Sequence, residues 1–139
     1  RATDRFQTLA QVGQVAPAYC TGVGKAMLAF IAPKRLQIVL QQQSFYKFTP
    51  ATHTSVASLN QELDSVRKDG IAFDREEHQQ GINSIATPIL SSSGRLIGAI
   101  SIATATNRFD CEALMQFKGS LLETAKKIGE DATSWQFPS

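Results

Sequence analysis

The sequence has 139 residues, of which 42% are hydrophobic and 19% charged, and it contains two cysteines. This composition is typical of one soluble globular domain, and two distant cysteines exclude a disulfide scaffold, a zinc ribbon and a CxxC redox motif. No apolar run is long enough to span a membrane, and the first residues do not resemble a signal peptide. A net charge of +2, spread along the chain, does not predict nucleic-acid binding by this segment. We therefore expect a cytoplasmic domain with no membrane partner.

The first part of the chain predicts a strand, two helices and a loop. Partial alternation over residues 6–18 indicates the strand. Residues 22–32 are apolar almost all round, with Lys25 as their one charge, which is typical of a buried helix. A proline ends this helix and begins another over residues 33–42. Residues 44–54 are rich in aromatic side chains and lack helical periodicity, so we expect a loop there.

Residues 55–70 carry the clearest helical pattern in the sequence. Ser55 suits the N-cap, and Gly70 suits the position after the last turn. Asp64 and Lys68 form a favourable pair one turn apart on the polar face. The apolar face consists of residues at helical spacing, which are Val56, Leu59, Leu63 and Val66. This pattern predicts an amphipathic helix.

The remainder of the chain predicts three strands and a final helix. A short strand is expected over residues 70–74, and two longer strands over 83–90 and 95–104. The link between the longer strands, Ser-Ser-Ser-Gly, is typical of a hairpin. An amphipathic helix follows over residues 111–128, with Asp110 as its cap. Strands beside helices, with a hairpin in place of a crossover, predict an α+β fold with an antiparallel sheet.

The hairpin also predicts which side chains share a face of the sheet. If Leu90 and Arg95 close it, Ser84 lies opposite Ser101, with the two Cβ atoms about 5 Å apart. One face is then apolar and carries Ile85, Ile89, Leu96, Ile100 and Ile102. The other face is small and carries Ser84, Ala86, Pro88, Ala99, Ser101 and Ala103. Small side chains leave room for a ligand or for close packing of the helix 22–32, and the two interpretations are compatible.

The turn at residues 21–25 (TGVGK) opens the first predicted helix. Free backbone N–H groups and the positive end of the helix dipole favour an anion, and glycines let it approach the backbone. The turn is not a Walker A loop, because Tyr19 replaces the first glycine and Ala26 replaces the Ser/Thr. With no magnesium ligands nearby, a carboxylate fits better than a polyphosphate. A tight turn into the helix would require the same glycines without any ligand, and this explanation is the more common one.

Residues 73–78 (FDREEH) contain the remaining chemical candidates. Asp74 ends the short strand and is a candidate to accept a hydrogen bond from a ligand hydroxyl, although such charge runs are more often solvated loops. His78 indicates a metal only weakly, because the spacing is not HExxH and His53 is the one other histidine. Cys20 and His78 form a nucleophile and base only if the fold brings them together. We therefore expect no metal, no cofactor and no catalytic constellation.

Four stretches of the sequence are weak singly but specific together. They are 19–29 (YCTGVGKAMLA), 59–74 (LNQELDSVRKDGIAFD), 76–88 (EEHQQGINSIATP) and 96–102 (LIGAISI). In this order and at this spacing, they resemble the effector-binding domain of the IclR family of bacterial transcription regulators. The resemblance implies a GAF/profilin-like α+β domain that binds a small metabolite.

The resemblance also implies a ligand pocket at eight positions of this chain. They are Gly22, Val23, Asp74, Ser84, Ser101, Thr8, Leu9 and Ala103. Gly22 and Val23 match the backbone donors that receive the ligand carboxylate, and Asp74 matches an acidic pocket residue. Ser84 stands where the family often has a cysteine, and Ser101 matches a serine on the strand.

Three of these positions have a less direct role. Ala103 stands where some members have a second serine, so this pocket has lost one hydroxyl. Thr8 and Leu9 fall near the apolar wall of the pocket. In the mechanism that follows, the N–H groups of residues 22–24 hold the carboxylate, while serines and an aspartate fix hydroxyl or keto groups.

Family ligands are small organic acids such as keto acids, sugar acids and aromatic acids. Their binding changes how a homodimer or homotetramer holds operator DNA through an N-terminal winged helix-turn-helix. The sequence contains no such DNA-binding domain and begins inside the family pattern, so we expect an N-terminally truncated effector domain. Two alternatives stay open: an enzyme that uses Cys20 and His78 in the same pocket, and a plain oligomerisation module.

Overall fold

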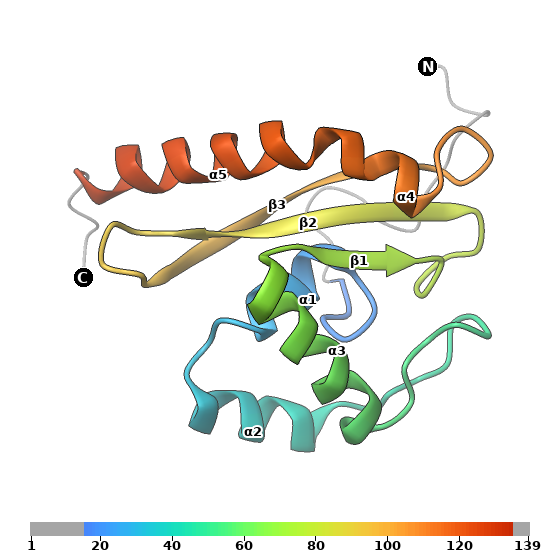
Figure 1. Ribbon diagram of the computed structural model, residues 1–139. Helices are drawn as coiled ribbons and strands as arrows, with labels where there is room; N and C mark the ends of the chain where they lie inside the picture. The colour runs from blue at the N-terminus through green and yellow to red at the C-terminus, as the bar shows by residue number, and fades with distance from the viewer. Residues whose placement is uncertain (1–15, 135–139) are drawn as a thin grey trace.

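Three antiparallel strands form the centre of the molecule in this computed structural model, which describes residues 16–134. The strands are β1 (Ala72–Arg75), β2 (Ile82–Leu90) and β3 (Leu96–Ala105), in the order β1-β2-β3. Helices cover both faces of this sheet (Figure 1), so the predicted α+β class with an antiparallel sheet is confirmed. Most of the strand expected over residues 6–18 lies outside the described residues, as do Thr8 and Leu9.

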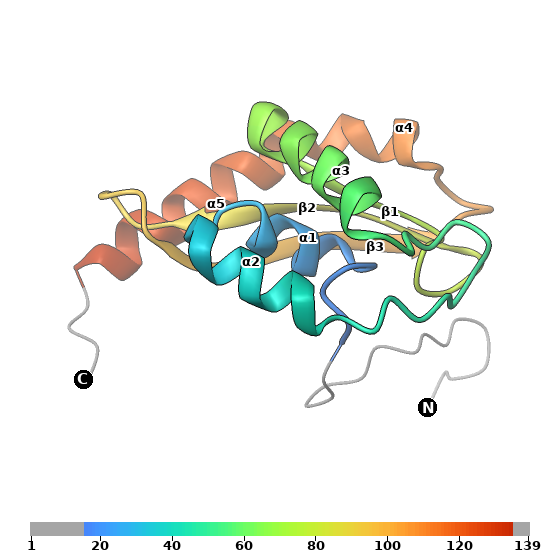
Figure 2. The same cartoon turned by 90° about the horizontal axis from the view of Figure 1, so that it is seen from below.

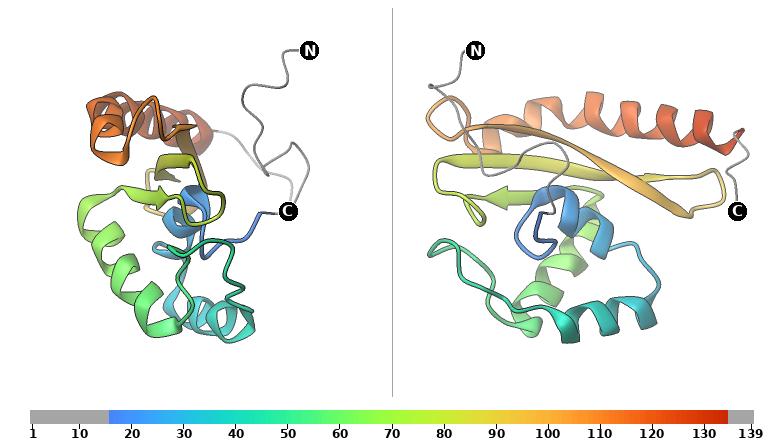
Figure 3. Two further views of the ribbon diagram at one scale, coloured as in Figure 1. Left: turned by 90° about the vertical axis from the view of Figure 1, so that its right-hand side faces the viewer. Right: turned by 180° about the vertical axis from the view of Figure 1, so that it is seen from behind.

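The helices divide into two layers, one on each side of the sheet. The helix α5 (Lys118–Thr133) lies along one face, while α1 (Gly22–Leu28) packs against all three strands on the other. The helices α2 (Pro33–Gln42) and α3 (Val56–Asp69) lie on the α1 side, with α2 farthest from the sheet (Figures 2 and 3). Within residues 16–134, the structure has no helix both long and apolar enough to cross a membrane.

The helix α3 follows the sequence prediction closely. The Ser55 hydroxyl accepts a hydrogen bond from the Ser58 N–H at 3.1 Å, as an N-cap does. Gly70 ends the helix in the left-handed region, with φ of 76°. The predicted apolar stripe is buried at Leu59, Leu63 and Val66, but its first member, Val56, is 41% exposed. Local caps and helical spacing therefore determine this element.

Two predicted helices differ from those observed. The first ends at Leu28 rather than at residue 32, and its N-cap is Thr21. The last is interrupted: α4 (Cys111–Leu114) passes through a short 3₁₀ turn, η1 (Met115–Phe117), before α5 begins. Phe117 packs edge-to-face on Phe109 at this point, with ring centroids 5.9 Å apart. Both side chains are partly buried and pack against the core, and helical periodicity alone does not predict the tighter turn between α4 and α5.

The predicted register of the hairpin is wrong by two residues. Ser84 lies opposite Ala103, and Ala86 lies opposite Ser101. The strands close one residue later than expected, and a bulge between Ile89 and Leu90 adds a second shift. Because two single shifts restore the alternation, the predicted division into a small face and an apolar face is correct.

Candidate functional site

The small face of the sheet lies directly under the first turn of α1. A Cβ atom built on Gly22 would stand 2.6 Å from the Ser84 Oγ and 3.2 Å from the Ala86 Cβ. Only a glycine at the helix and small residues on the strand permit this approach. The close-packing interpretation of the small face is therefore confirmed at Gly22, and any ligand must sit beside this contact rather than within it.

Most of the predicted pocket residues meet at this place. Asp74 pairs with Ser84 across β1 and β2, and Ser84 pairs with Ala103 across β2 and β3. Ser101 is one pair farther along the same face. Ser84 and Asp74 are buried, whereas Ser101 and Ala103 are exposed. The fold thus joins the helix N-terminus, two serines and one carboxyl group.

The N–H groups at the start of α1 are not all available to a ligand. The Gly24 N–H donates to the Thr21 hydroxyl at 3.2 Å, which is the ordinary N-cap bond. Among residues 16–134, no acceptor stands opposite the N–H of Gly22 or Val23. The predicted group of three donors is therefore reduced to two.

Asp74 is 6% exposed, and its ionisation is perturbed by that burial. Burial raises the pKa of Asp74 to about 6, while the hydrogen bond that its Oδ1 accepts from the Glu77 N–H, at 2.8 Å, lowers it. The nearby Glu77 charge raises the pKa further, and Lys25 lowers it. Asp74 thus changes charge within the physiological range, beside the free end of α1.

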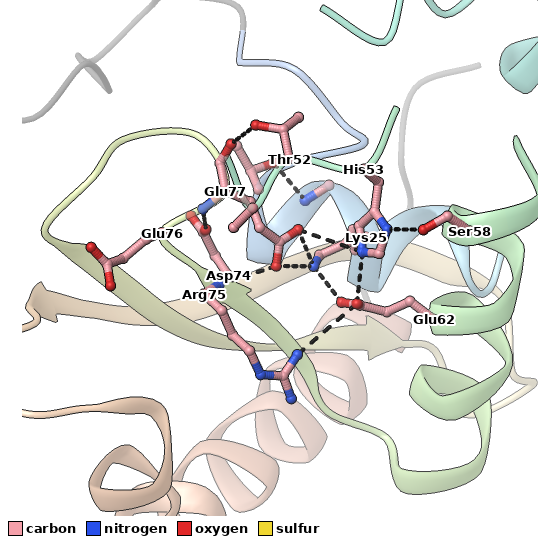
Figure 4. A network of polar contacts seen from close by, with 12 residues as sticks. Lys25, Thr52, His53, Ser58, Glu62, Asp74, Arg75, Glu76 and Glu77 are labelled. Atoms are coloured by element: carbon pink, nitrogen blue, oxygen red, sulfur yellow. Dashed lines mark hydrogen bonds and ion pairs between the residues drawn. The ribbon is translucent and has the colours of Figure 1, made fainter. Parts of the chain in front are cut away.

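Behind Asp74 lies a buried ion cluster that the sequence patterns did not reveal (Figure 4). Lys25 is fully buried, and its Nζ donates to Glu77 Oε1 at 2.7 Å and Oε2 at 2.8 Å, and also to Glu62. Lys25 as the single charge of an apolar helix was the available signal, since a buried charge requires a partner. The partners come from α3 and from the segment after β1, which are distant in sequence.

The cluster continues through Glu62 to His53. His53 Nε2 lies 2.8 Å from Glu62 Oε1, and His53 Nδ1 lies 2.6 Å from the Ser58 hydroxyl. Burial opposes the ionisation of Glu62, but the contacts with Lys25 and His53 outweigh it and lower its pKa. Arg75 lies at the edge of the cluster, with Nη1 4.0 Å from Glu62 Oε1.

The charge run after β1 is therefore not the solvated loop that its composition favours. Glu77 is 3% exposed, and its main-chain oxygen accepts a hydrogen bond from the Thr52 hydroxyl at 2.5 Å. The Glu76 main-chain oxygen accepts one from Thr49 at 2.6 Å. His78 packs edge-to-face on Phe48, with ring centroids 4.8 Å apart. Tertiary contacts with the loop before α3 fix this segment.

A metal ion fits this cluster poorly. His53, Glu62 and Glu77 bring ligand atoms within 4.8 Å of one another, and these residue types ligate metals. Both carboxylates, however, already contact the Lys25 ammonium group, which supplies a positive charge between them. The donor atoms of these three residues thus belong to an ion-pair network.

The two cysteines lack the features of a nucleophile. Cys20 is fully buried, and burial raises the pKa of its thiol to about 12. Burial also raises the pKa of Cys111, whose Sγ lies 3.7 Å from the Asp74 main-chain oxygen. A protonated, inaccessible thiol does not attack a substrate.

Three surface cavities lie elsewhere on the molecule, although Pro88 of the small face lines one of them. Their volumes are about 400, 530 and 630 Å³, and none of the three is lined by Gly22, Asp74 or Ser84. The first adjoins the ion cluster at His53 and Glu62.

The described residues form an α+β domain with a three-stranded antiparallel sheet. The family model described as "Bacterial transcriptional regulator IclR C-terminal" matches residues 1–130. The chain belongs to the IclR family of bacterial transcriptional regulators and corresponds to their C-terminal, effector-binding domain. The predicted family is confirmed.

Relatives and solved structures agree with this assignment. The HTH-type transcriptional regulator XynR of Escherichia coli (strain K12) is 33% identical over 111 residues, covering 80% of this chain and 44% of that protein. A putative transcriptional regulator from Rhodococcus sp. RHA1 superposes with a TM-score of 0.87 at 29% identity, covering 95% of this chain and 54% of that one. The chain spans about half the length of the curated relatives it matches.

A second solved structure is of a ligand complex. It is a double mutant of the PobR transcription factor inducer-binding domain from Acinetobacter, in complex with 3-hydroxybenzoic acid. It superposes with a TM-score of 0.83 at 27% identity, covering 91% of this chain and 74% of that one.

Proposed function

We propose that this domain binds a small organic acid, a keto acid or a sugar acid, at the junction of α1 with β1 and β2. Binding controls how the full-length homodimer or homotetramer holds operator DNA, through a cytoplasmic winged helix-turn-helix domain outside residues 1–139. The observation that carries the proposal is the pair of N–H groups of Gly22 and Val23, unpartnered among the described residues, beside buried Asp74 and Ser84. Two N–H donors and one buried carboxyl group suit a ligand that has a carboxylate at one end and hydroxyl groups at the other.

The acid end of the ligand faces the start of α1. A carboxylate would accept hydrogen bonds from the N–H groups of Gly22 and Val23, which have no acceptor within the helix. It would replace water at these two groups. The 3-hydroxybenzoic acid bound to the PobR domain has such a carboxylate and a hydroxyl group, which supports this class of ligand. Thr8 and Leu9 would contribute the apolar wall.

The other end of the ligand faces Asp74, Ser84 and Ser101. An ionised Asp74 accepts hydrogen bonds from hydroxyl groups and repels carboxylates, so it orients the ligand with its acid end toward the helix. The serine hydroxyls can donate to a keto oxygen as well as accept from a hydroxyl group. Ala103 offers no polar group, which leaves space for the carbon skeleton.

The two other functions are weighed against the same residues. An enzyme that uses Cys20 needs an accessible thiolate, and burial opposes this. A plain oligomerisation module would leave the donors of Gly22 and Val23 without a ligand. Binding of an acid distinguishes the sensor from the module, and turnover of the acid distinguishes the enzyme from both.

Thermal unfolding against matched acids and amides tests the proposal. The panel contains pyruvate, gluconate and 3-hydroxybenzoate, each beside its amide. A ligand at 100 times its dissociation constant stabilises the fold by about 2.7 kcal/mol, which raises the melting temperature by several degrees. We expect a shift with one acid and none with its amide. A folded domain that responds to no acid, or equally to acid and amide, would refute the site.

Val23→Pro tests the backbone donors directly. Proline removes one N–H but is compatible with the first turn of a helix, and Gly22 before it has no Cβ to clash. We expect the acid-induced shift to be lost while the domain stays folded. Ser93→Ala, in the exposed hairpin link, is the matched control and should keep the full shift.

A further inference from the structure

The segment that follows Asp74 is held in a strained conformation. Glu76 has φ of 57°, a left-handed conformation that non-glycine residues rarely adopt. Hydrogen bonds to its main-chain oxygen from Thr49 and to its side chain from the Gly81 N–H, both at 2.6–2.7 Å, hold the turn. Such strain persists where the surroundings over-determine it, and it concentrates at functional sites.

Glu77 connects this turn to two different partners. Its carboxylate receives two hydrogen bonds from Lys25 in α1 and one from the Arg75 N–H at 3.1 Å. Its own N–H donates to Asp74 Oδ1 at 2.8 Å. Glu77 therefore joins α1 to the carboxyl group of Asp74.

Lys25 in turn fixes Glu77 from the interior. With no solvent exposure, its ammonium group depends on Glu77 and Glu62 for all of its polar contacts among the described residues. His53 faces both carboxylates of the cluster, with Nε2 2.8 Å from Glu62 Oε1 and 3.9 Å from Glu77 Oε1, and Arg75 lies beside Glu62. A rotation of Glu77 away from Lys25 would leave a buried charge with half of its partners, so the arrangement resists change.

We propose that Glu77 is the positioning residue of the effector site. Glu77 is anchored on buried Lys25, and it holds the Asp74 carboxylate in the orientation that accepts hydrogen bonds from ligand hydroxyl groups. This inference rests on the proposed effector site. Glu77 itself does not contact the ligand. Its loss should therefore abolish selectivity for a hydroxyl group and leave recognition of the acid end, at Gly22 and Val23, in place.

Selectivity between paired acids measures this role. The pairs are 3-hydroxybenzoate with benzoate and lactate with propionate, which differ by one hydroxyl group. Because a hydrogen bond to a charged group is involved, we expect the native domain to prefer one hydroxylated acid by about tenfold or more. Glu77→Gln should reduce that preference to within about twofold, with little change in affinity for the deoxy acid. Glu123→Gln, the same change at an exposed residue of α5, should keep the preference.

A second readout requires no ligand. The amide proton of residue 77 donates to Asp74, so its NMR shift should follow the ionisation of Asp74, with a midpoint near pH 6. Asp74→Asn should remove that titration, which verifies its source. Glu77→Gln should remove most of its amplitude, and Glu123→Gln in α5 should preserve it.

The outcomes separate this inference from the proposed function. If the native domain binds none of the four acids, the amide titration alone decides whether Glu77 positions Asp74. An unchanged titration amplitude in Glu77→Gln, or an unchanged preference for the hydroxylated acid, overturns the proposal. If Glu77→Gln does not fold, the double variant Lys25→Met/Glu77→Gln removes both charges together and gives the same two readouts.

Discussion

The two faces of the sheet are covered by helices in different ways. Toward α5, large side chains such as Ile85 and Leu121 pack in an apolar core. Toward α1, small side chains of the sheet such as Ala86 pack in a second apolar core with α1 and α3. This side also has the close approach of the Gly22 backbone to Ser84 and the buried Lys25 with its carboxylate partners. The second face thus adds close approach and charge pairing to apolar packing, and the proposed ligand-binding function belongs to it.

The largest expected effect is the loss of Lys25. Lys25→Ala leaves the Glu77 carboxylate buried without its cation, so we expect a loss of about 3–5 kcal/mol in the free energy of unfolding, measured with urea. Lys34→Ala, an exposed lysine of α2, should change it by less than about 0.5 kcal/mol. A loss below about 1 kcal/mol for Lys25→Ala would mean that the cluster is solvated.

The apolar face should respond to volume instead. Ile85 is fully buried, and Ile85→Ala should cost about 2–5 kcal/mol, whereas Ile85→Val should cost about 0.5–1.5 kcal/mol. Ile38→Ala, on the exposed side of α2, serves as the control and should be nearly neutral. Equal losses for the valine and alanine variants would contradict a contribution graded by volume.

Stability should also depend on pH through Asp74. Because its pKa is raised from 3.8 to about 6, the folded state holds a proton that the unfolded state has already released between these values. Protonated Asp74 adds on the order of 2–3 kcal/mol to the free energy of unfolding below about pH 4. This addition is lost as the pH rises through 6. Urea unfolding from pH 4 to 7 measures it. The profile of Asp74→Asn should be flatter by that amount, and parallel profiles would remove Asp74 as the source.

The same comparison shows what the sequence could predict. The caps of α3 and the apolar stripe of Leu59 and Leu63 are local signals, and they proved correct. The two faces of the hairpin were also predictable, because alternation survives a shift by two residues. The register was not, since the bulge near Leu90 depends on the fold around the hairpin.

The candidate site was predictable in part for a similar reason. The sequence predicts Asp74 and Ser84 as pocket residues, and strand pairing brings them together. The cluster of Lys25 with Glu62 and Glu77 joins three segments that are far apart in sequence. No rule of sequence spacing connects such residues. The composition of residues 73–78 by itself predicts a solvated loop. Only the isolated charge within an apolar helix pointed to a buried partner.

The smallest of these effects tests the close approach of α1 to the sheet. Gly22→Ala places a Cβ atom 2.6 Å from the Ser84 Oγ, so we expect a loss of about 1–3 kcal/mol in urea unfolding, although alanine is the better helix former. Ser84→Gly removes the atom that is struck, and the double variant should recover part of the loss. At Gly119, where a Cβ meets nothing within 4 Å, the alanine variant should not destabilise. If the losses in the free energy of unfolding are additive in the double variant, Gly22 does not contact Ser84. The start of α1, and with it the proposed position of the ligand carboxylate, would then lie elsewhere on the sheet.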